Sequence, residues 1–105
     1  MAREARAVVP AYRVAIPPPV TERIRHLPPD LKRAVREAIR AIGQDPGRGD
    51  PLQRELRDYR KYRVRRFRVI YRVDRRAKAV IIVALGHRRA IYEELAAALR
   101  PRSRG

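Results

Sequence analysis

The chain has 105 residues, with 27 Lys or Arg against 11 Asp or Glu, which gives a formal net charge of +16. A chain of this length has room for one hydrophobic core, so we expect a single domain over residues 1–105. The absence of Cys excludes disulfides and thiolate chemistry, and two His are too few for a His-rich metal site, so no metal or cofactor is expected. No apolar run approaches the roughly 18 residues of a membrane span, and no signal peptide is apparent, so we expect a cytoplasmic protein without a membrane partner.

The positive charge is concentrated in the second half of the chain. Residues 1–50 carry a net charge of +4, whereas residues 51–105 carry +12, and 24 of the basic residues are Arg. A GC-rich genome is one explanation of the preference for Arg over Lys, but it does not explain the net charge. Such an excess of charge attracts polyanions in general, a class that includes nucleic acid, an anionic membrane surface and an acidic protein.

The first half of the chain predicts one strand followed by two helices. Apolar side chains alternate over residues 8–16, which is typical of an outer strand, and three Pro at 17–19 end it and open a short helix. A second helix begins at Pro28-Pro29 and presents one apolar face over residues 31–42. Gly43 is the predicted stop of this helix, and a turn-rich loop follows over residues 45–51.

The second half predicts three strands and a last helix. Strand-like runs cover residues 60–64, 67–73 and 79–85, and the short links between them indicate an antiparallel meander. Residues 91–99 favour a helix that ends at Pro101. The predicted fold class is therefore α+β: an N-terminal strand, two antiparallel helices on one face of an antiparallel sheet of about four strands, and a C-terminal helix.

Period-2 alternation places basic side chains on one side of two neighbouring strands. Lys61, Arg63 and possibly Arg65 share one side of their strand, and Arg68 and Arg72 share one side of the next. If the two sides coincide, the sheet presents a cluster of cations that suits a phosphodiester backbone. The alternative is a solvent-facing strand side with ordinary charges.

The sequence contains no motif of a conventional hydrolase. It has no Ser-His-Asp set, no paired carboxylates of obvious geometry, no Gly-rich phosphate loop and no HExxH motif. Polar groups do follow the apolar strand, in the run GHRRAIY at residues 86–92, where a strand leads into a helix. There His87 is either a surface or capping histidine or a site residue, and Tyr92 is either a core anchor or a site residue.

Two segments in combination resemble the RelE/ParE superfamily of toxins from type II toxin–antitoxin modules. They are residues 56–74, which end in FRVIYRVD, and residues 86–92, GHRRAIY. The resemblance extends to the N-terminal strand, the Leu27-Pro28-Pro29 helix start and the Asp45-Pro46 loop, so it covers most of the chain. It implies a RelE-like fold.

For the RelE-like branch, the resemblance implies a ribosome-dependent endoribonuclease, an mRNA interferase that cuts mRNA in the ribosomal A site. The RNA 2′-hydroxyl would attack the neighbouring phosphate and leave a 2′,3′-cyclic phosphate and a 5′-hydroxyl. By position, Lys61 is the candidate general base with Arg63 beside it, and neighbouring cations favour the loss of its proton. Arg68 and Arg88 would hold the phosphate, and Tyr92 would stack on or orient a base. The further RNA-binding candidates are Arg65, Arg66, Arg72, His87 and Arg89.

The sequence departs from the family pattern at two places. Members commonly carry Gly where Arg65-Arg66 lies, since a tight turn favours positive φ. Two consecutive Arg therefore predict a wider turn and leave open a one-residue slip in the register of Lys61 and Arg63. The basic position before Arg88 is His87 here, so either Arg88 or His87 is the candidate acid for the leaving 5′-oxygen.

The resemblance also implies partners. A cognate antitoxin, acidic in the segment that binds, would cover the basic sheet face, and the toxin–antitoxin complex would be of higher order and bind DNA through the antitoxin. Two other functions stay open: a ParE-like toxin directed at DNA gyrase, and a non-catalytic basic domain that binds RNA or the ribosome. The presence of Lys61, Arg63, Arg68, Arg88 and Tyr92 favours the ribonuclease over the gyrase-directed toxin.

Overall fold

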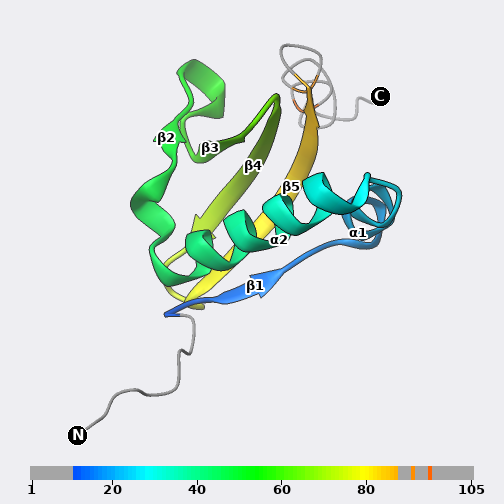
Figure 1. The fold of residues 1–105 in the computed structure, drawn as a ribbon. Helices are drawn as coiled ribbons and strands as arrows, with labels where there is room; N and C mark the ends of the chain where they lie inside the picture. Colours follow the sequence, from blue (N-terminus) through cyan, green and yellow to red (C-terminus); the bar gives the residue numbers. More distant parts are fainter. Residues whose placement is uncertain (1–10, 88–90, 92–94, 96–105) are drawn as a thin grey trace, which may run out of the picture.

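A computed structural model describes residues 11–87, 91 and 95. Within this part of the chain, two helices cover one face of a five-stranded sheet with the strand order β1-β5-β4-β3-β2 (Figure 1). The strands are β1 (Arg13–Ala15), β2 (Asp50–Pro51), β3 (Tyr59–Val64), β4 (Phe67–Asp74) and β5 (Ala79–His87). The helices are α1 (Pro18–Arg25) and α2 (Pro29–Gln44), with short 3-10 turns η2 (Pro46–Arg48) and η3 (Arg54–Leu56). The predicted α+β class is confirmed.

Both helices begin at proline, as predicted, because proline fits the first turn where no N–H partner is needed. The predicted stop at Gly43 is wrong by one residue, since α2 continues to Gln44. Gly43 is buried inside the helix, and its carbonyl accepts a hydrogen bond from the backbone N–H of Tyr12 at 3.1 Å. This glycine therefore marks the contact between α2 and the segment that leads into β1.

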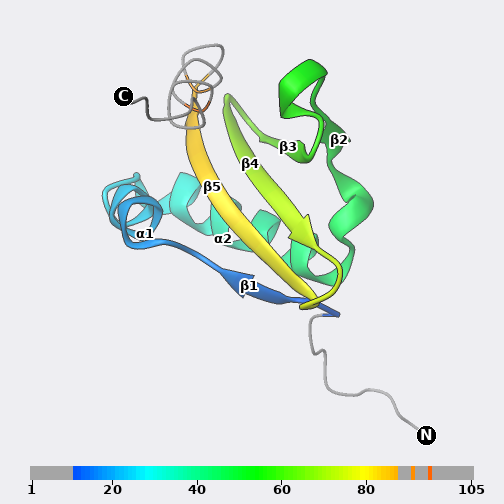
Figure 2. The ribbon, with the colours of Figure 1, turned by 180° about the vertical axis from the view of Figure 1, so that it is seen from behind.

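The main core lies between the helices and one face of the sheet. Seen from behind, β4 and β5 lie in front of α2, so both helices are on the same side (Figure 2). The apolar stripe of α2 supplies Val35, Ile39 and Ile42, and the sheet supplies Val69 and Tyr71 among other side chains. The alternation predicted for residues 67–73 is confirmed, because Phe67 and Val73 also pack against this core.

The outer strands differ from the prediction. β1 pairs with β5 in parallel, with Arg13 opposite Ala79, whereas an antiparallel sheet was expected. The intervening helices α1 and α2 return the chain to the start of the sheet, which is what a parallel pairing requires. At the other edge, Asp50–Pro51 in the predicted loop forms β2 and pairs with β3, which makes five strands rather than about four.

The β3–β4 hairpin is tight, contrary to the wider turn expected from two Arg. Val64 pairs with Phe67, so Arg65 and Arg66 are the two residues of the turn, and the register of β3 does not slip. Arg65 adopts a φ of 56°, in the left-handed region that favours glycine. The sheet pairing on both sides of the turn therefore holds Arg65 in a conformation that its side chain disfavours.

A β-bulge interrupts the β4–β5 ladder. Ile70 pairs with Ala84 and Tyr71 with Ile82, so Val83 is left without a direct partner. Val83 and Ala84 both contact a second apolar cluster on the sheet face away from α2, where Ile70, Ile91 and Leu95 are buried. The predicted C-terminal helix over residues 91–99 lies outside the described residues except for Ile91 and Leu95.

Candidate functional site

Four cations share the sheet face away from the helices. In the β3–β4 register, Lys61 lies opposite Ile70, Arg63 opposite Arg68, and Tyr59 opposite Arg72. Because directly opposite residues project to the same side of a sheet, the predicted coincidence of the two basic strand sides is confirmed. We call the side formed by Lys61, Arg63, Arg68 and Arg72 the cationic face.

Arg63 and Arg68 form the centre of this face. Directly opposite residues in an antiparallel pair have Cβ atoms about 4.5–5.5 Å apart, and like charges at that distance destabilise the sheet. Arg63 is exposed and forms no ion pair with a described residue, while Arg68 is half-buried. The planar forks of guanidinium groups suit phosphate oxygens, and the register sets two of them next to each other on this face.

Lys61 lies one alternation from Arg63 on the same strand. It is half-buried, with Ile70 opposite it on β4 and Asp50 opposite it on β2. Sequence reasoning missed Asp50, because β2 lies inside a segment rich in Pro and Gly. The Asp50 carboxylate is the acidic group that the register brings beside Lys61, and an ammonium bounded in this way loses side-chain freedom.

A buried tyrosine fixes the loop that carries Asp50. The Tyr71 hydroxyl donates to the Pro46 carbonyl at 2.7 Å and accepts from the Gly49 N–H at 2.9 Å. A Cβ at Gly49 would lie 2.5 Å from the Lys61 carbonyl oxygen, so only glycine fits where the loop passes β3. Arg60 points to the same loop, and its guanidinium donates to the Gly49 carbonyl. Burial raises the pKa of Tyr71 above 10.0, and the Gly49 hydrogen bond and the Arg60 charge oppose the rise.

The second apolar cluster borders the cationic face. Ile70 is fully buried between Lys61 and the β5 bulge, and Leu52, Leu56 and Tyr59 pack around it. Sequence reasoning missed this cluster, since it assigned the whole side of β4 that carries Arg68, Ile70 and Arg72 to solvent and substrate. The cations thus lie around an apolar centre, and Arg63 among them is exposed to solvent.

The remaining predicted site residues are not all on this face. Arg65 and Arg66 are exposed in the hairpin turn at its end. His87 pairs with Phe67, so it projects to the side of the helices rather than to the cationic face. Arg88, Arg89 and Tyr92 lie outside the described residues.

The described residues offer no metal centre and no membrane span. Residues 11–87, 91 and 95 contain no group of three or more His, Cys, Asp or Glu side chains that could hold a metal ion. In the same part of the chain, neither helix is long and apolar enough to cross a bilayer. Within the described residues, the cationic face gathers four basic side chains on neighbouring strands.

Comparisons with known proteins give consistent matches. Residues 20–92 match the family model described as ParE toxin of type II toxin-antitoxin system, parDE. The structure of the RelBE2 toxin-antitoxin complex from Mycobacterium tuberculosis contains a chain with 33% identity and a TM-score of 0.67, covering 76% of this chain and 100% of that one. No curated protein sequence matches.

Two further structures share the fold. The archaeal RelE-RelB complex from Pyrococcus horikoshii matches with 26% identity and a TM-score of 0.62, covering 75% of this chain and 97% of that one. A mutant of the E. coli toxin RelE in the free state matches with 18% identity and a TM-score of 0.70, covering 85% and 98%. At 18% identity, the latter match shows the fold alone.

Proposed function

We propose that this chain, which belongs to the RelE/ParE superfamily of toxins from type II toxin–antitoxin systems, is an endoribonuclease that cleaves mRNA in the ribosomal A site. The observation that carries the proposal is the convergence of Lys61, Arg63 and Arg68 on one sheet face. A gyrase-directed toxin has no need for three cations on one side of two neighbouring strands. A ribonuclease that lacks catalytic His and Glu pairs does need them.

The chemistry is attack of a ribose 2′-hydroxyl on its own 3′-phosphate. Lys61 takes the hydroxyl proton, the new P–O bond forms, and the bond to the 5′-oxygen of the next nucleotide breaks. The products are a 2′,3′-cyclic phosphate and a 5′-hydroxyl. Arg63 and Arg68 stabilise the negative charge that develops on the non-bridging oxygens, in a position already set by the sheet.

The other roles follow from the family resemblance. Arg88 adds a third guanidinium to the phosphate, Tyr92 orients a base, and either Arg88 or His87 protonates the leaving 5′-oxygen. His87 would have to reach the cationic face around the end of β5, because its pairing with Phe67 directs it to the helix side. Both residues therefore stay candidates for the acid, and Arg88 lies outside the described residues.

The proposed partners are the ribosome with its mRNA and a cognate antitoxin. The solved structures similar to this chain include toxin-antitoxin complexes, which supports an antitoxin for this protein. The net charge of +16 favours an antitoxin with an acidic binding segment. A cytoplasmic location and a higher-order complex that binds DNA through the antitoxin complete the proposal.

The test is cleavage of mRNA on purified ribosomes, with the RNA ends mapped by primer extension. The wild-type chain is expected to cut within the codon in the A site. Arg68→Ala should cut about 100- to 1,000-fold more slowly, which is the usual effect of removing one donor to a developing oxyanion. The matched control is Arg75→Ala, which removes the same charge from the exposed β4–β5 turn at the opposite end of the sheet and should cut at the wild-type rate. Equal rates for Arg68→Ala and the wild type would contradict the placement of the site.

The family description names ParE, which favours a gyrase-directed toxin as the second candidate. Induction of the gene in cells separates the two functions. Codon-phased cuts in translated mRNA support the ribonuclease, whereas DNA damage with intact mRNA supports action on gyrase. Ribosome binding without either effect identifies a non-catalytic RNA-binding domain.

A further inference from the structure

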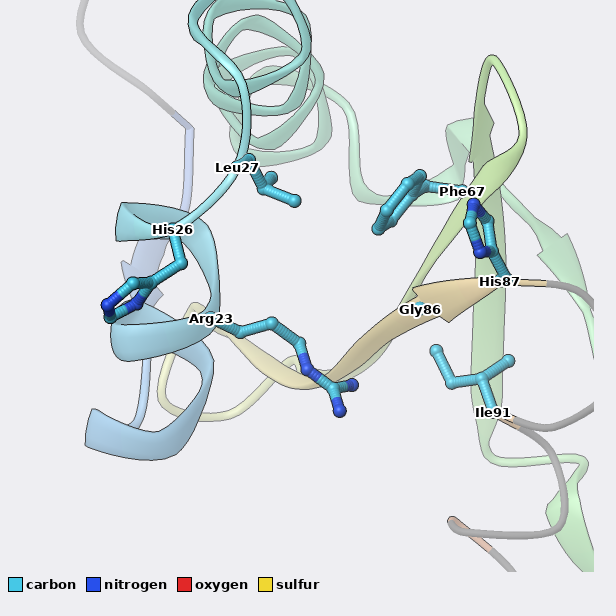
Figure 3. Close-up of a pocket in the computed structure, with 7 residues that line it drawn as sticks. All are labelled: Arg23, His26, Leu27, Phe67, Gly86, His87 and Ile91. Carbon is cyan, nitrogen blue, oxygen red and sulfur yellow. The ribbon is translucent and has the colours of Figure 1, made fainter.

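A cavity of about 350 Å³ opens where α1 meets the end of β5. Its lining consists of Arg23, His26, Leu27, Phe67, Gly86, His87 and Ile91 (Figure 3). Phe67 and His87 lie side by side, Leu27 points into the opening, and the ring of His26 points away from it. The His26 Nδ1 lies 2.9 Å from the Glu22 carbonyl oxygen, so this ring belongs to the rim and not to the interior.

The two rings form a partly exposed aromatic platform. The centroids of Phe67 and His87 are 4.3 Å apart, with the ring planes tilted by 51°. Phe67 is half-buried against the main core, which fixes its ring, while His87 is exposed. Because the two ring planes are tilted, a planar ligand can stack on the face of one ring and meet the other ring at an angle.

A guanidinium group forms another wall of the cavity. β1 pairs with β5 only as far as Ile81, so the backbone of β5 beyond that residue has a free edge beside α1. Arg23 reaches this edge from α1, and its guanidinium donates to the Leu85 carbonyl. Because that hydrogen bond fixes the group, its planar face and its charge have a defined position beside the platform.

The cavity adjoins the cationic face at Gly86. Gly86 lies directly opposite Arg68 in the β4–β5 register. Gly86 also lines the cavity, and a Cβ built on it would be in ordinary van der Waals contact with the Arg23 guanidinium at 3.5 Å and with Ile91 at 3.6 Å, so the cavity and the side that carries Arg68 meet at this residue. A chain of nucleotides with one phosphate at Arg68 can therefore place a neighbouring base in the cavity.

We propose that this cavity is a base-binding subsite for single-stranded RNA, in which Phe67 and His87 form the stacking platform and Arg23 adds a cation–π contact. The choice of RNA as ligand rests on the proposed function. The side chains that line the cavity agree with RNA as the ligand. Proteins hold unpaired bases without sequence preference by stacking them on aromatic side chains next to cations. The subsite would position the nucleotide next to the scissile phosphate, on the other side of the sheet end from Lys61.

The test compares two ligands of equal charge. One is a fluorescein-labelled 2′-O-methyl decaadenylate, and the other is the same backbone without bases; the 2′-O-methyl groups block cleavage. Fluorescence anisotropy with the purified full chain should show about tenfold tighter binding of the ligand with bases, as expected for one stacked base. Since both ligands carry the same phosphates, this preference should not change with salt concentration.

Two variants remove the platform in different ways. Phe67→Leu keeps an apolar side chain against the core, and His87→Ala changes an exposed residue that the fold does not need. Each should reduce the preference for bases to about threefold or less, with binding of the abasic ligand unchanged and with a wild-type circular dichroism spectrum. The control Arg75→Ala should weaken binding of both ligands equally and keep the preference.

The proposal is overturned if the wild type binds both ligands equally, or if both platform variants keep the full preference for bases. These outcomes are independent of the cleavage assay. A chain that cuts no mRNA on ribosomes refutes the proposed function, while its base preference still reports on the cavity. A chain that cuts mRNA but shows no base preference refutes only the subsite.

Discussion

We expect the hydroxyl of Tyr71, on β4, to hold the loop before β2 in place against the sheet. It donates to the Pro46 carbonyl and accepts from the Gly49 N–H, over 25 and 22 residues of sequence respectively. Replacement of Tyr71 by Phe removes both hydrogen bonds and keeps the ring. Because Pro46 and Gly49 are buried, a carbonyl and an N–H are then left without partners in the interior.

The magnitude follows from those two groups. Each buried backbone group without a partner costs about 1–3 kcal/mol, so Tyr71→Phe should lower the free energy of unfolding by about 2–6 kcal/mol. For a domain of about 100 residues, this corresponds to a fall in Tm of roughly 8–24 °C. An ordinary domain of this size has a free energy of unfolding of about 5–15 kcal/mol, so such a loss would be a large share of it.

The assay is guanidinium chloride unfolding followed by circular dichroism, with Tyr62→Phe as the matched control. Tyr62 lies on the neighbouring strand, is half-buried against the same core, and its hydroxyl has no hydrogen bond to a described residue. The control should change the free energy of unfolding by less than about 0.5 kcal/mol. Equal losses for Tyr71→Phe and Tyr62→Phe would refute the structural role of the Tyr71 hydroxyl.

The same variant makes a test with pH possible. Burial raises the pKa of Tyr71 above 10.0 in the folded state, so the folded chain holds this proton more tightly than the unfolded chain does. The associated stability is fully present below pH 10.0 and declines as pH rises above it. The difference in stability between the wild type and Tyr71→Phe should therefore shrink as the pH rises above 10.0, and a constant difference would contradict the burial of a neutral phenol.

Two further substitutions test the backbone, each with a neighbour as control. Arg65→Gly should raise the free energy of unfolding by about 1 kcal/mol, because Arg65 has a φ of 56°. The control Arg66→Gly changes a position without positive φ and should lower the free energy of unfolding by about 0.5–1 kcal/mol. A change of the same sign for both variants would refute the assignment of strain to Arg65. Gly49→Ala should lower the free energy of unfolding by about 3 kcal/mol, since its Cβ would lie 2.5 Å from the Lys61 carbonyl oxygen. The control Gly47→Ala should lower it by less than about 1 kcal/mol, because the atom nearest to that Cβ would be 3.7 Å away. Both pairs are measured by chemical denaturation, and equal effects at Gly49 and Gly47 would contradict the close passage of the loop.

The elements with a regular pattern could be predicted from the sequence. The apolar stripe of α2 and the alternation of β4 follow from local periodicity, and short links determined the meander. The opposite position of Arg63 and Arg68 followed from the same alternation together with a hairpin. These features depend on residues close in sequence, so the local pattern was sufficient.

Features that depend on distant segments could not be predicted. The parallel direction of β1 depends on where the helices return the chain, and β2 depends on the hydrogen bonds of Tyr71 to a loop more than 20 residues away. The tight turn at Arg65 was not predicted, because Arg disfavours positive φ by about 1 kcal/mol. The strand pairing on both sides of the turn outweighs this local preference. The cavity at Phe67 and His87 forms because α1 lies beside the end of β5, and the residue spacing in the sequence does not predict this contact.

The bulge at Val83 reverses which residues of β5 face the helices, from the even-numbered to the odd-numbered ones. Before it, the even-numbered Val80 and Ile82 face the helices; after it, the odd-numbered Leu85 and His87 do. An uninterrupted strand would have turned Leu85 outward beside Arg68 and placed Gly86 in the core. The single extra residue instead leaves the smallest side chains of the strand, Ala84 and Gly86, on the side of the cations. One unpaired residue thus decides which side chains of β5 face the core, and it places Ala84 against Ile70, Ile91 and Leu95 on the opposite side of the sheet.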